Sequence, residues 1–176
     1  MTVGPDSILI KSVKDRYNSS VLDTTALRDE VTHVIKKSSL LQICTFLKDN
    51  LALQFNFLSD VTAVDYFPQK PRFEVIYHLY SIAKKHRVRL KVKLDDGETI
   101  PSVTAIWSAA NWAEREAYDM FGIRFEGHPE LRRIYMPEDW DGFPLRKDYP
   151  LKGYKDRYNP YGEEKEGSGV KGQGSR

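Results

Sequence analysis

A change of composition at Gly122 constrains the fold of this 176-residue chain more than any other feature. Nine of the 11 glycines and five of the nine prolines lie in residues 122–176. Proline removes a backbone donor and fixes φ, and glycine weakens helices and strands, so long regular elements are not expected there. The sequence therefore predicts a globular domain over residues 1–121, followed by an irregular C-terminal segment.

Residues 122–161 are predicted to form an extended arm that docks on a partner. Disordered segments are poor in aromatics, yet residues 124–161 interleave eight aromatic side chains with five arginines. Tyr, Trp and Arg anchor protein interfaces, and proline lowers the entropy lost on docking. A partner surface is favoured over self-packing, although the home domain can cover part of the arm. Residues 162–176 contain no aromatic residue and are expected to be a flexible tail.

The first 121 residues show the mixed periodicity of an α+β fold, expected as a small two-layer domain with a mixed sheet. Residues 73–82 are apolar at successive positions, which indicates a central strand buried on both faces. Strands are also predicted at residues 30–35 and 51–64, and helices at 40–48 and 107–121, the last of which should end at Gly122.

Residues 88–94 alternate apolar and basic side chains and precede Asp95-Asp96-Gly97. Alternation before an Asp-Gly turn is typical of a hairpin, so a returning strand is predicted over residues 99–103. A solvated sheet face is favoured for the bases of this region, with an acidic protein partner or a nucleic acid as alternatives. The bases are Lys84, Lys85, Arg87, Arg89, Lys91 and Lys93.

Glu116 departs from the separation of apolar and polar sides in the helix predicted over residues 107–121. On a helical wheel the alanines form one apolar stripe, and Glu116 falls at its edge. A carboxylate there must be paired, because an unpaired buried charge is costly. We expect a buried ion pair with Arg124, Arg132 or Arg133 rather than a catalytic acid, which would need a pocket and a base. The side of the wheel opposite the stripe carries Asn111, Glu114, Arg115 and Asp119.

The sequence carries no catalytic, metal-binding or nucleotide-binding motif. His33, His78, His86 and His128 have no metal-ligand spacing. His128, in a Gly-His-Pro turn, is expected to stabilise that turn by a hydrogen bond. Cys44 is the only cysteine, so it can form neither an internal disulfide nor a thiolate-ligated cluster. Its place on an apolar helical face indicates a packed thiol, and a single cysteine favours a reducing compartment.

The overall charge gives little reason to expect nucleic acid or an anionic membrane as a partner. The formal net charge is +2, from 27 basic and 25 acidic residues. No apolar run approaches the roughly 18 residues needed to span a bilayer. The N-terminal residues 1–17 lack the apolar stretch of a secretory signal. We therefore expect a chain that is soluble or attached to a membrane only through other proteins.

Three segments around the compositional break resemble a known family. They read EREAYDMFGIRFEGHP at 114–129, LRRIYMPEDW at 131–140 and PLRKDYP at 144–150. Together they are similar to the signature of the C subunit family of respiratory complex I, the NADH:quinone oxidoreductase. Upstream matches at 60–65, 77–80 and 101–104 extend the resemblance over roughly residues 30–152.

The resemblance implies a non-catalytic subunit of the hydrophilic arm of a proton-translocating complex, peripheral on the cytoplasmic side of the bacterial inner membrane. Its C-terminal extension would wrap over the D subunit, near the B subunit. The chain would bind no cofactor, while FMN, iron–sulfur clusters and quinone would belong to other subunits. The residues implied in structural or partner contacts are Glu114, Arg115, Glu116, Asp119, His128, Arg132, Arg133, Trp140, Arg146, Lys147, Asp148 and Tyr149.

Two other interpretations remain open. Ferredoxin-dependent quinone oxidoreductases and membrane-bound hydrogenases contain an equivalent subunit with the same arm motif, so one chain does not define the electron donor. The more remote alternative is a nucleic-acid-binding module that uses the basic sheet face.

Overall fold

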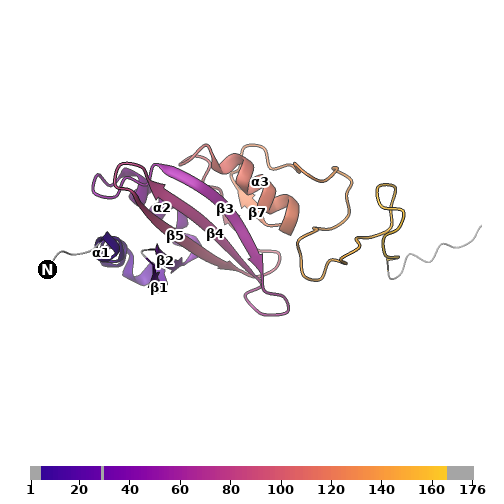
Figure 1. The fold of residues 1–176 in the computed structure, drawn as a ribbon, viewed down its shortest axis with the longest axis horizontal. Coiled ribbons are helices and arrows are strands. Elements are labelled where there is room, and N and C mark those ends of the chain that lie inside the picture. The colour runs from indigo at the N-terminus through magenta and orange to yellow at the C-terminus, as the bar shows by residue number, and fades with distance from the viewer. Residues whose placement is uncertain (1–4, 29, 166–176) are drawn as a thin grey trace, which may run out of the picture.

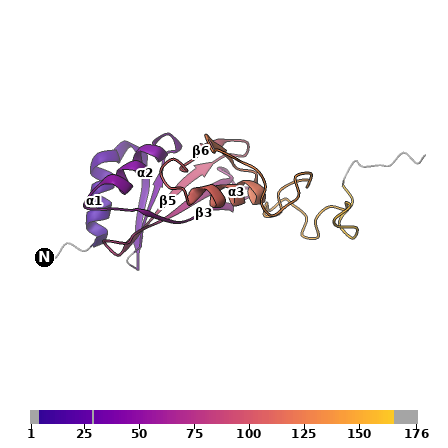
Figure 2. The ribbon, with the colours of Figure 1, turned by 90° about the horizontal axis from the view of Figure 1, so that it is seen from above.

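A computed structural model describes residues 5–28 and 30–165, and its fold is α+β as predicted (Figures 1 and 2). Five strands form a mixed sheet in the order β1-β2-β5-β4-β3, and β6 and β7 form a separate two-stranded sheet. The strands are β1 (Val21–Leu27), β2 (Glu30–Ile35), β3 (Phe57–Asp65), β4 (Phe73–Ser81), β5 (His86–Leu94), β6 (Thr99–Pro101) and β7 (Arg124–Glu126). The helices are α1 (Pro5–Tyr17), α2 (Leu40–Asp49) and α3 (Ala110–Phe121).

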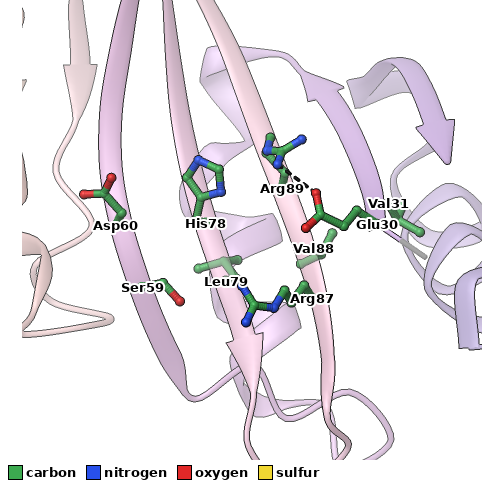
Figure 3. Close-up of a pocket in the computed structure, with 9 residues that line it drawn as sticks. All are labelled: Glu30, Val31, Ser59, Asp60, His78, Leu79, Arg87, Val88 and Arg89. Carbon is green, nitrogen blue, oxygen red and sulfur yellow. Dashed lines mark hydrogen bonds and ion pairs between the residues drawn. The ribbon is translucent and has the colours of Figure 1, made fainter. Parts of the chain in front are cut away.

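The two faces of the sheet differ because successive side chains of a strand point in opposite directions. On β5, the valines and leucines at alternate positions from Val88 to Leu94 are buried toward the helices. The bases at the intervening positions lie on the other face. That face carries polar side chains from four strands, among them Asp60, His78 and Arg89 (Figure 3).

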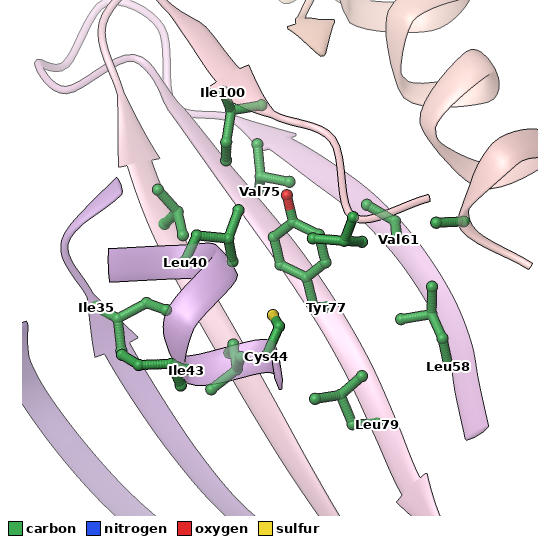
Figure 4. Packing of buried hydrophobic residues seen from close by; sticks show 14 of the residues in the cluster. Ile35, Leu40, Ile43, Cys44, Leu58, Val61, Val75, Tyr77, Leu79 and Ile100 are labelled. Atoms are coloured by element: carbon green, nitrogen blue, oxygen red, sulfur yellow. The ribbon is translucent and has the colours of Figure 1, made fainter. Parts of the chain in front are cut away.

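The apolar face of the sheet and the helices share one core. In α2 the buried residues follow the spacing i, i+3, i+4, i+7, which places them on one side of a helix. Tyr77 of β4 is fully buried beneath this helix, close to Cys44 (Figure 4). Cys44 is fully buried, so the predicted packed thiol is confirmed, and its burial raises the pKa of the thiol.

The strand predicted over residues 73–82 is confirmed as β4, which lies between β3 and β5. The hairpin predicted between residues 88–94 and 99–103 is wrong. Strand β5 pairs antiparallel with β4 and parallel with β2, so neither of its edges is free for a returning strand. The turn at Asp95–Gly97 does form, with a hydrogen bond from the Glu98 N–H to the Asp95 carbonyl (3.2 Å). The chain then leaves the sheet, and β6 pairs in parallel with β7.

The C-terminal arm starts at the predicted stop of α3. Gly122 adopts φ 78°, and its N–H donates to the Tyr118 carbonyl at 2.8 Å. From there the chain passes along α3 through β7 and runs away from the sheet with little regular structure (Figure 1). Residues 153–155 and 163 make a short bridge near its end, and the rest of the predicted tail, residues 166–176, lies outside the described residues.

Gly122 allows the arm to fold back closely on α3. A Cβ atom at this position would lie 2.5 Å from the ring of Phe143, and the positive φ would add backbone strain. We expect Gly122→Ala to lower the free energy of unfolding by about 2–4 kcal/mol, measured by denaturant titration. Gly97→Ala is the matched control, because its φ is 83° and a Cβ there would meet no atom within 4 Å. It should cost only the strain, about 1 kcal/mol. Equal losses in the two variants would contradict the close packing of Phe143.

Candidate functional site

Helix α3 buries the charged residues that lie opposite its apolar stripe on the helical wheel. Glu114 and Asp119 are fully buried and Arg115 nearly so, whereas Glu116 is exposed. The predicted buried ion pair of Glu116 is therefore wrong; its carboxylate accepts a hydrogen bond from the Tyr135 hydroxyl at 3.3 Å. The wheel assumed that only the apolar stripe is covered. In the structure the arm returns along the other side of α3 and covers it as well.

Asp119 binds the backbone of the arm. Its Oδ2 accepts the backbone N–H groups of Ile134 (3.0 Å), Tyr135 (2.7 Å) and Met136 (2.9 Å). Its Oδ1 pairs with the Arg133 guanidinium at 2.7 Å. Burial by itself would raise the pKa of Asp119, but these hydrogen bonds outweigh it and hold the pKa below its usual range. Asp119 is therefore ionised at neutral pH and organises three consecutive residues of the arm.

Two arginines complete this contact, which we call the helix anchor: Asp119, Arg115 and Arg133 with the arm backbone that they bind. Arg133 also donates to the carbonyls of Trp140 (3.1 Å) and Gly142 (3.0 Å), and so fixes the arm further along. Arg115 donates to the carbonyls of Arg132 (3.1 Å) and Arg133 (3.3 Å). The acid of α3 that pairs with an arginine of the arm is therefore Asp119, with Arg133, and not Glu116 as predicted.

Glu114 holds the loop that enters α3. Its carboxylate accepts the Ser102 hydroxyl at 2.6 Å and the Val103 N–H at 2.7 Å, both just after β6. These neutral donors bring no positive charge to the carboxylate. Burial raises the pKa of Glu114 to about 7, and the two hydrogen bonds only partly oppose this. Glu114 therefore differs from Asp119: it is a buried carboxyl group that is partly protonated near neutral pH.

A second contact, the sheet anchor, joins the arm to the end of the sheet beyond β3 and β4. Arg72 binds both carboxylate oxygens of Asp65 (3.0 and 2.9 Å) and also contacts Asp148 of the arm at 2.6 Å. Asp96 lies against Arg72 at 2.9 Å and against Arg146 at 3.2 Å. The sheet anchor is defined by these five residues. No sequence motif points to Arg72, because the three acids that it contacts lie far apart from one another in the sequence.

Further contacts hold the arm residues in and beside the sheet anchor. The Lys147 N–H donates to Asp65 at 2.9 Å, while the Lys147 side chain is exposed. Arg146 donates to the Phe121 carbonyl at 2.7 Å. The Tyr149 ring would lie 2.7 Å from a Cβ at Gly142, so this glycine makes room for it.

The remaining predicted residues divide between turn formation and exposure. His128 accepts the Glu130 N–H at Nδ1 (3.0 Å) and contacts the Asn111 carbonyl through Nε2 (3.1 Å), which confirms the predicted turn hydrogen bond. Arg132 is exposed and pairs with its neighbour Glu130. The Trp140 ring lies 6.2 Å from that of Tyr158.

The arm leaves large apolar and aromatic side chains exposed although its backbone is anchored. On the outer side of α3, Trp112 is 65% exposed and stacks on Arg115, whose guanidinium carbon lies 4.6 Å from the ring. Leu151 and Tyr161 protrude almost completely, at 102% and 91% exposure. The others on the arm are Tyr135, Leu145 and Tyr158. Aromatic and arginine side chains held on an ordered backbone are typical of protein interfaces.

Among residues 5–28 and 30–165, no group of three or more His, Cys, Asp or Glu side chains is arranged to hold a metal ion. Within the same described ranges, no helix combines the length and the apolar character that a bilayer crossing requires. The charges that are gathered around α3 bind backbone groups and each other.

The fold and the two anchors define an α+β domain with an irregular C-terminal arm that is fixed to the domain by ion pairs and hydrogen bonds. A family model described as "Respiratory-chain NADH dehydrogenase, 30 Kd subunit" matches residues 33–155. The second C subunit of the NADH-quinone oxidoreductase of Rhizobium etli is 49% identical over 164 residues, which cover 93% of this chain and 87% of that protein. The C subunit of the same enzyme from Citrifermentans bemidjiense is 52% identical over 145 residues, covering 82% and 89%. The chain belongs to this family of complex I subunits, as its sequence motifs predicted.

A solved structure shares the fold. A chain of the membrane-bound sulfane sulfur reductase, an archaeal respiratory membrane complex, superposes with a TM-score of 0.69 at 23% identity. The match covers 81% of this chain and 84% of that one. At this identity the likeness supports the fold alone.

The helix anchor predicts a large loss of stability on replacing one acid of α3 and a small loss on replacing another. Asp119→Asn removes the charge that pairs with Arg133 and receives the arm, so we expect the free energy of unfolding to fall by about 3 kcal/mol. Glu116→Gln changes an exposed side chain and should cost less than about 0.5 kcal/mol. Denaturant titration of both variants is the measurement. Similar losses in both, or a larger loss for Glu116→Gln, would contradict the helix anchor.

Glu114 predicts a pH dependence of stability. Its folded pKa of about 7 exceeds its ordinary value of 4.5. The folded state therefore binds more protons, and this contribution is full below pH 4.5 and is lost as the pH rises to about 7. Between about pH 4.5 and 8 we expect wild type to lose about 3 kcal/mol more stability than Glu114→Gln. Glu116→Gln is the matched control and should keep the wild-type profile. An unchanged profile in Glu114→Gln would refute the assignment.

Proposed function

We propose that this chain is a structural, non-catalytic subunit in the hydrophilic arm of a proton-translocating NADH:quinone oxidoreductase. In this role it supports the quinone-reducing module and carries no cofactor, while FMN, iron–sulfur clusters and quinone belong to other subunits. One observation carries the proposal: Arg115, Asp119 and Arg133 direct their charges at the backbone of the arm, whose exposed aromatics are thereby held in place. Such charges organise a surface rather than a reaction.

The proposed docking element is the arm of residues 122–161, and the proposed partner is the D subunit of the complex, with the B subunit nearby. The support is physical. An arm that is already fixed at the helix anchor and the sheet anchor loses little conformational entropy on binding. Leu151 and Tyr161 then offer apolar surface that the chain's own domain leaves uncovered. The chain would lie on the cytoplasmic side of the membrane and be held there through the complex.

The electron donor of the complex is a separate question. The relatives that match along most of this chain are named NADH-quinone oxidoreductase subunits, which favours NADH. The same fold occurs in a sulfane sulfur reductase complex, so an equivalent subunit of a ferredoxin-dependent oxidoreductase or a membrane-bound hydrogenase is the second candidate. Purification of the native complex through this chain distinguishes them, because NADH- and flavin-binding subunits should co-purify only in the first case.

Arm docking predicts a selective loss of assembly. Leu151→Ser and Tyr161→Ser change exposed side chains, so the melting temperature of the purified chain should not fall. If the arm docks, the double variant should recover on the order of tenfold less partner protein in affinity purification. Leu27→Ser is the matched control, because Leu27 is 73% exposed but lies on β1, outside the arm. Undiminished recovery with the double variant would refute docking through this part of the arm.

Proteolysis gives an independent test. Trypsin should cleave after the exposed Lys152 and Arg157 in the isolated chain and much more slowly in the assembled complex. The exposed Lys36, at the end of β2, serves as an internal reference outside the arm. Equal cleavage of the arm in both samples would mean that no partner covers it.

A further inference from the structure

The basic run along β5 separates into two parts with different partners. Arg89 pairs with Glu30 at 2.9 Å, and Lys91 pairs with Glu74 at 2.7 Å. These two bases are neutralised within the sheet face and need no external partner. The solvated-face interpretation made from the sequence therefore suits the middle of the strand.

The turn between β4 and β5 carries two further bases, Lys84 and Lys85, and Arg87 follows at the start of β5. Lys84, Lys85 and Arg87 are exposed, and none of them has an acidic partner in the part of the chain that the structure describes. Arg87 rests on the ring of Tyr80, with 5.3 Å from its guanidinium carbon to the ring centroid. Three positive charges thus stand together at one end of the open sheet face.

Lys85 holds an unfavourable backbone conformation in this turn. Its φ is 55°, a left-handed value that glycine or asparagine adopts more readily than lysine. The turn itself needs only the backbone, since the Lys85 N–H donates to the Ser81 carbonyl at 2.8 Å. A lysine at this position therefore adds backbone strain, while its side chain forms no hydrogen bond or ion pair within the described residues, which points to a role outside the chain.

A hollow of about 280 Å³ lies on the open face of the sheet, and of the three bases Arg87 lines it. It is lined by side chains from four strands, and Arg87 and His78 lie on it beside Ser59 (Figure 3). The pairing register of β3 shifts between Leu58 and Asp60, which places Ser59 in a bulge at its rim. Two exposed apolar side chains belong to the same ends of the strands. Ile82 (58% exposed) follows the last residue of β4, and Phe57 (47% exposed) is the first residue of β3.

We propose that this end of the open face, defined by Lys84, Lys85, Arg87 and the adjoining hollow, is a second docking surface that binds an acidic segment of a neighbouring subunit. The inference rests on the proposed function, because it takes the chain to work inside a complex. Carboxylates of the partner neutralise the three bases, and its apolar side chains cover Ile82. The exposed apolar side chains of Ile82 and Phe57 beside the bases suit a protein segment that carries its own apolar side chains better than a phosphate backbone.

Zero-length crosslinking of the native complex tests this surface. A carbodiimide joins a lysine amine to a carboxylate only when the two are in contact. We expect peptides containing Lys84 or Lys85 crosslinked to Asp or Glu of another subunit, and at least fivefold slower acetylation of both lysines in the complex than in the purified chain. Acetylation at equal rates in both samples overturns the proposal. Protection that a nuclease abolishes also overturns it and assigns the surface to nucleic acid.

Variants separate docking from folding. Lys85→Gly relieves the positive φ, so its melting temperature should equal or exceed that of wild type. With Lys84→Gln added, partner recovery at the crosslinked subunit should fall about tenfold. The double variant Lys36→Gln and Lys93→Gln is the matched control, because it removes two exposed lysines at the opposite end of β2 and β5. Normal recovery with the turn variant overturns this surface while arm docking stands; failure of the whole chain to co-purify with any subunit would instead defeat the proposed function.

Discussion

The buried carboxylate of Asp119 is the interaction on which the shape of this protein depends. It accepts three consecutive backbone N–H groups of the arm and the guanidinium of Arg133. A segment rich in glycine and proline forms few hydrogen bonds of its own, so its backbone needs acceptors from elsewhere. Asp119 supplies these acceptors from α3, and Arg133 donates hydrogen bonds to the carbonyls of Trp140 and Gly142 further along the arm. Without this contact the arm has no defined path along α3.

Buried charge serves different purposes in neighbouring turns of the same helix. Asp119 keeps its charge because its hydrogen bonds outweigh the cost of burial. Glu114 meets only a hydroxyl and one N–H, and burial raises its pKa to about 7. Further along the arm, Arg72 forms ion pairs with acids from three separate segments of the chain. The arm is thus fixed at two places by ionised groups, while several of its aromatic side chains remain exposed.

This division suits a subunit whose contribution is a surface. The family of the chain consists of complex I subunits, and the fold recurs in a respiratory complex of different chemistry. The internal contacts that anchor the arm do not depend on the chemistry of the complex, since one fold can serve different functions. The open sheet face adds a second region in which paired and unpaired bases are segregated along one strand.

The sequence by itself determined the elements whose signals are local. The apolar run of β4, the helical spacing of α2, the glycine stop at Gly122 and the turn bonding of His128 each depend on neighbours within a few residues. The sequence motifs likewise identified the family. Only the tertiary structure decided which strand pairs with β5 and which acids of α3 are buried. A helical wheel places Glu116 and Asp119 on faces, but burial follows from what returns to cover each face. The covering segment here is an aperiodic arm, and its path is set by Asp119 and Arg72, whose partners lie up to 76 residues away.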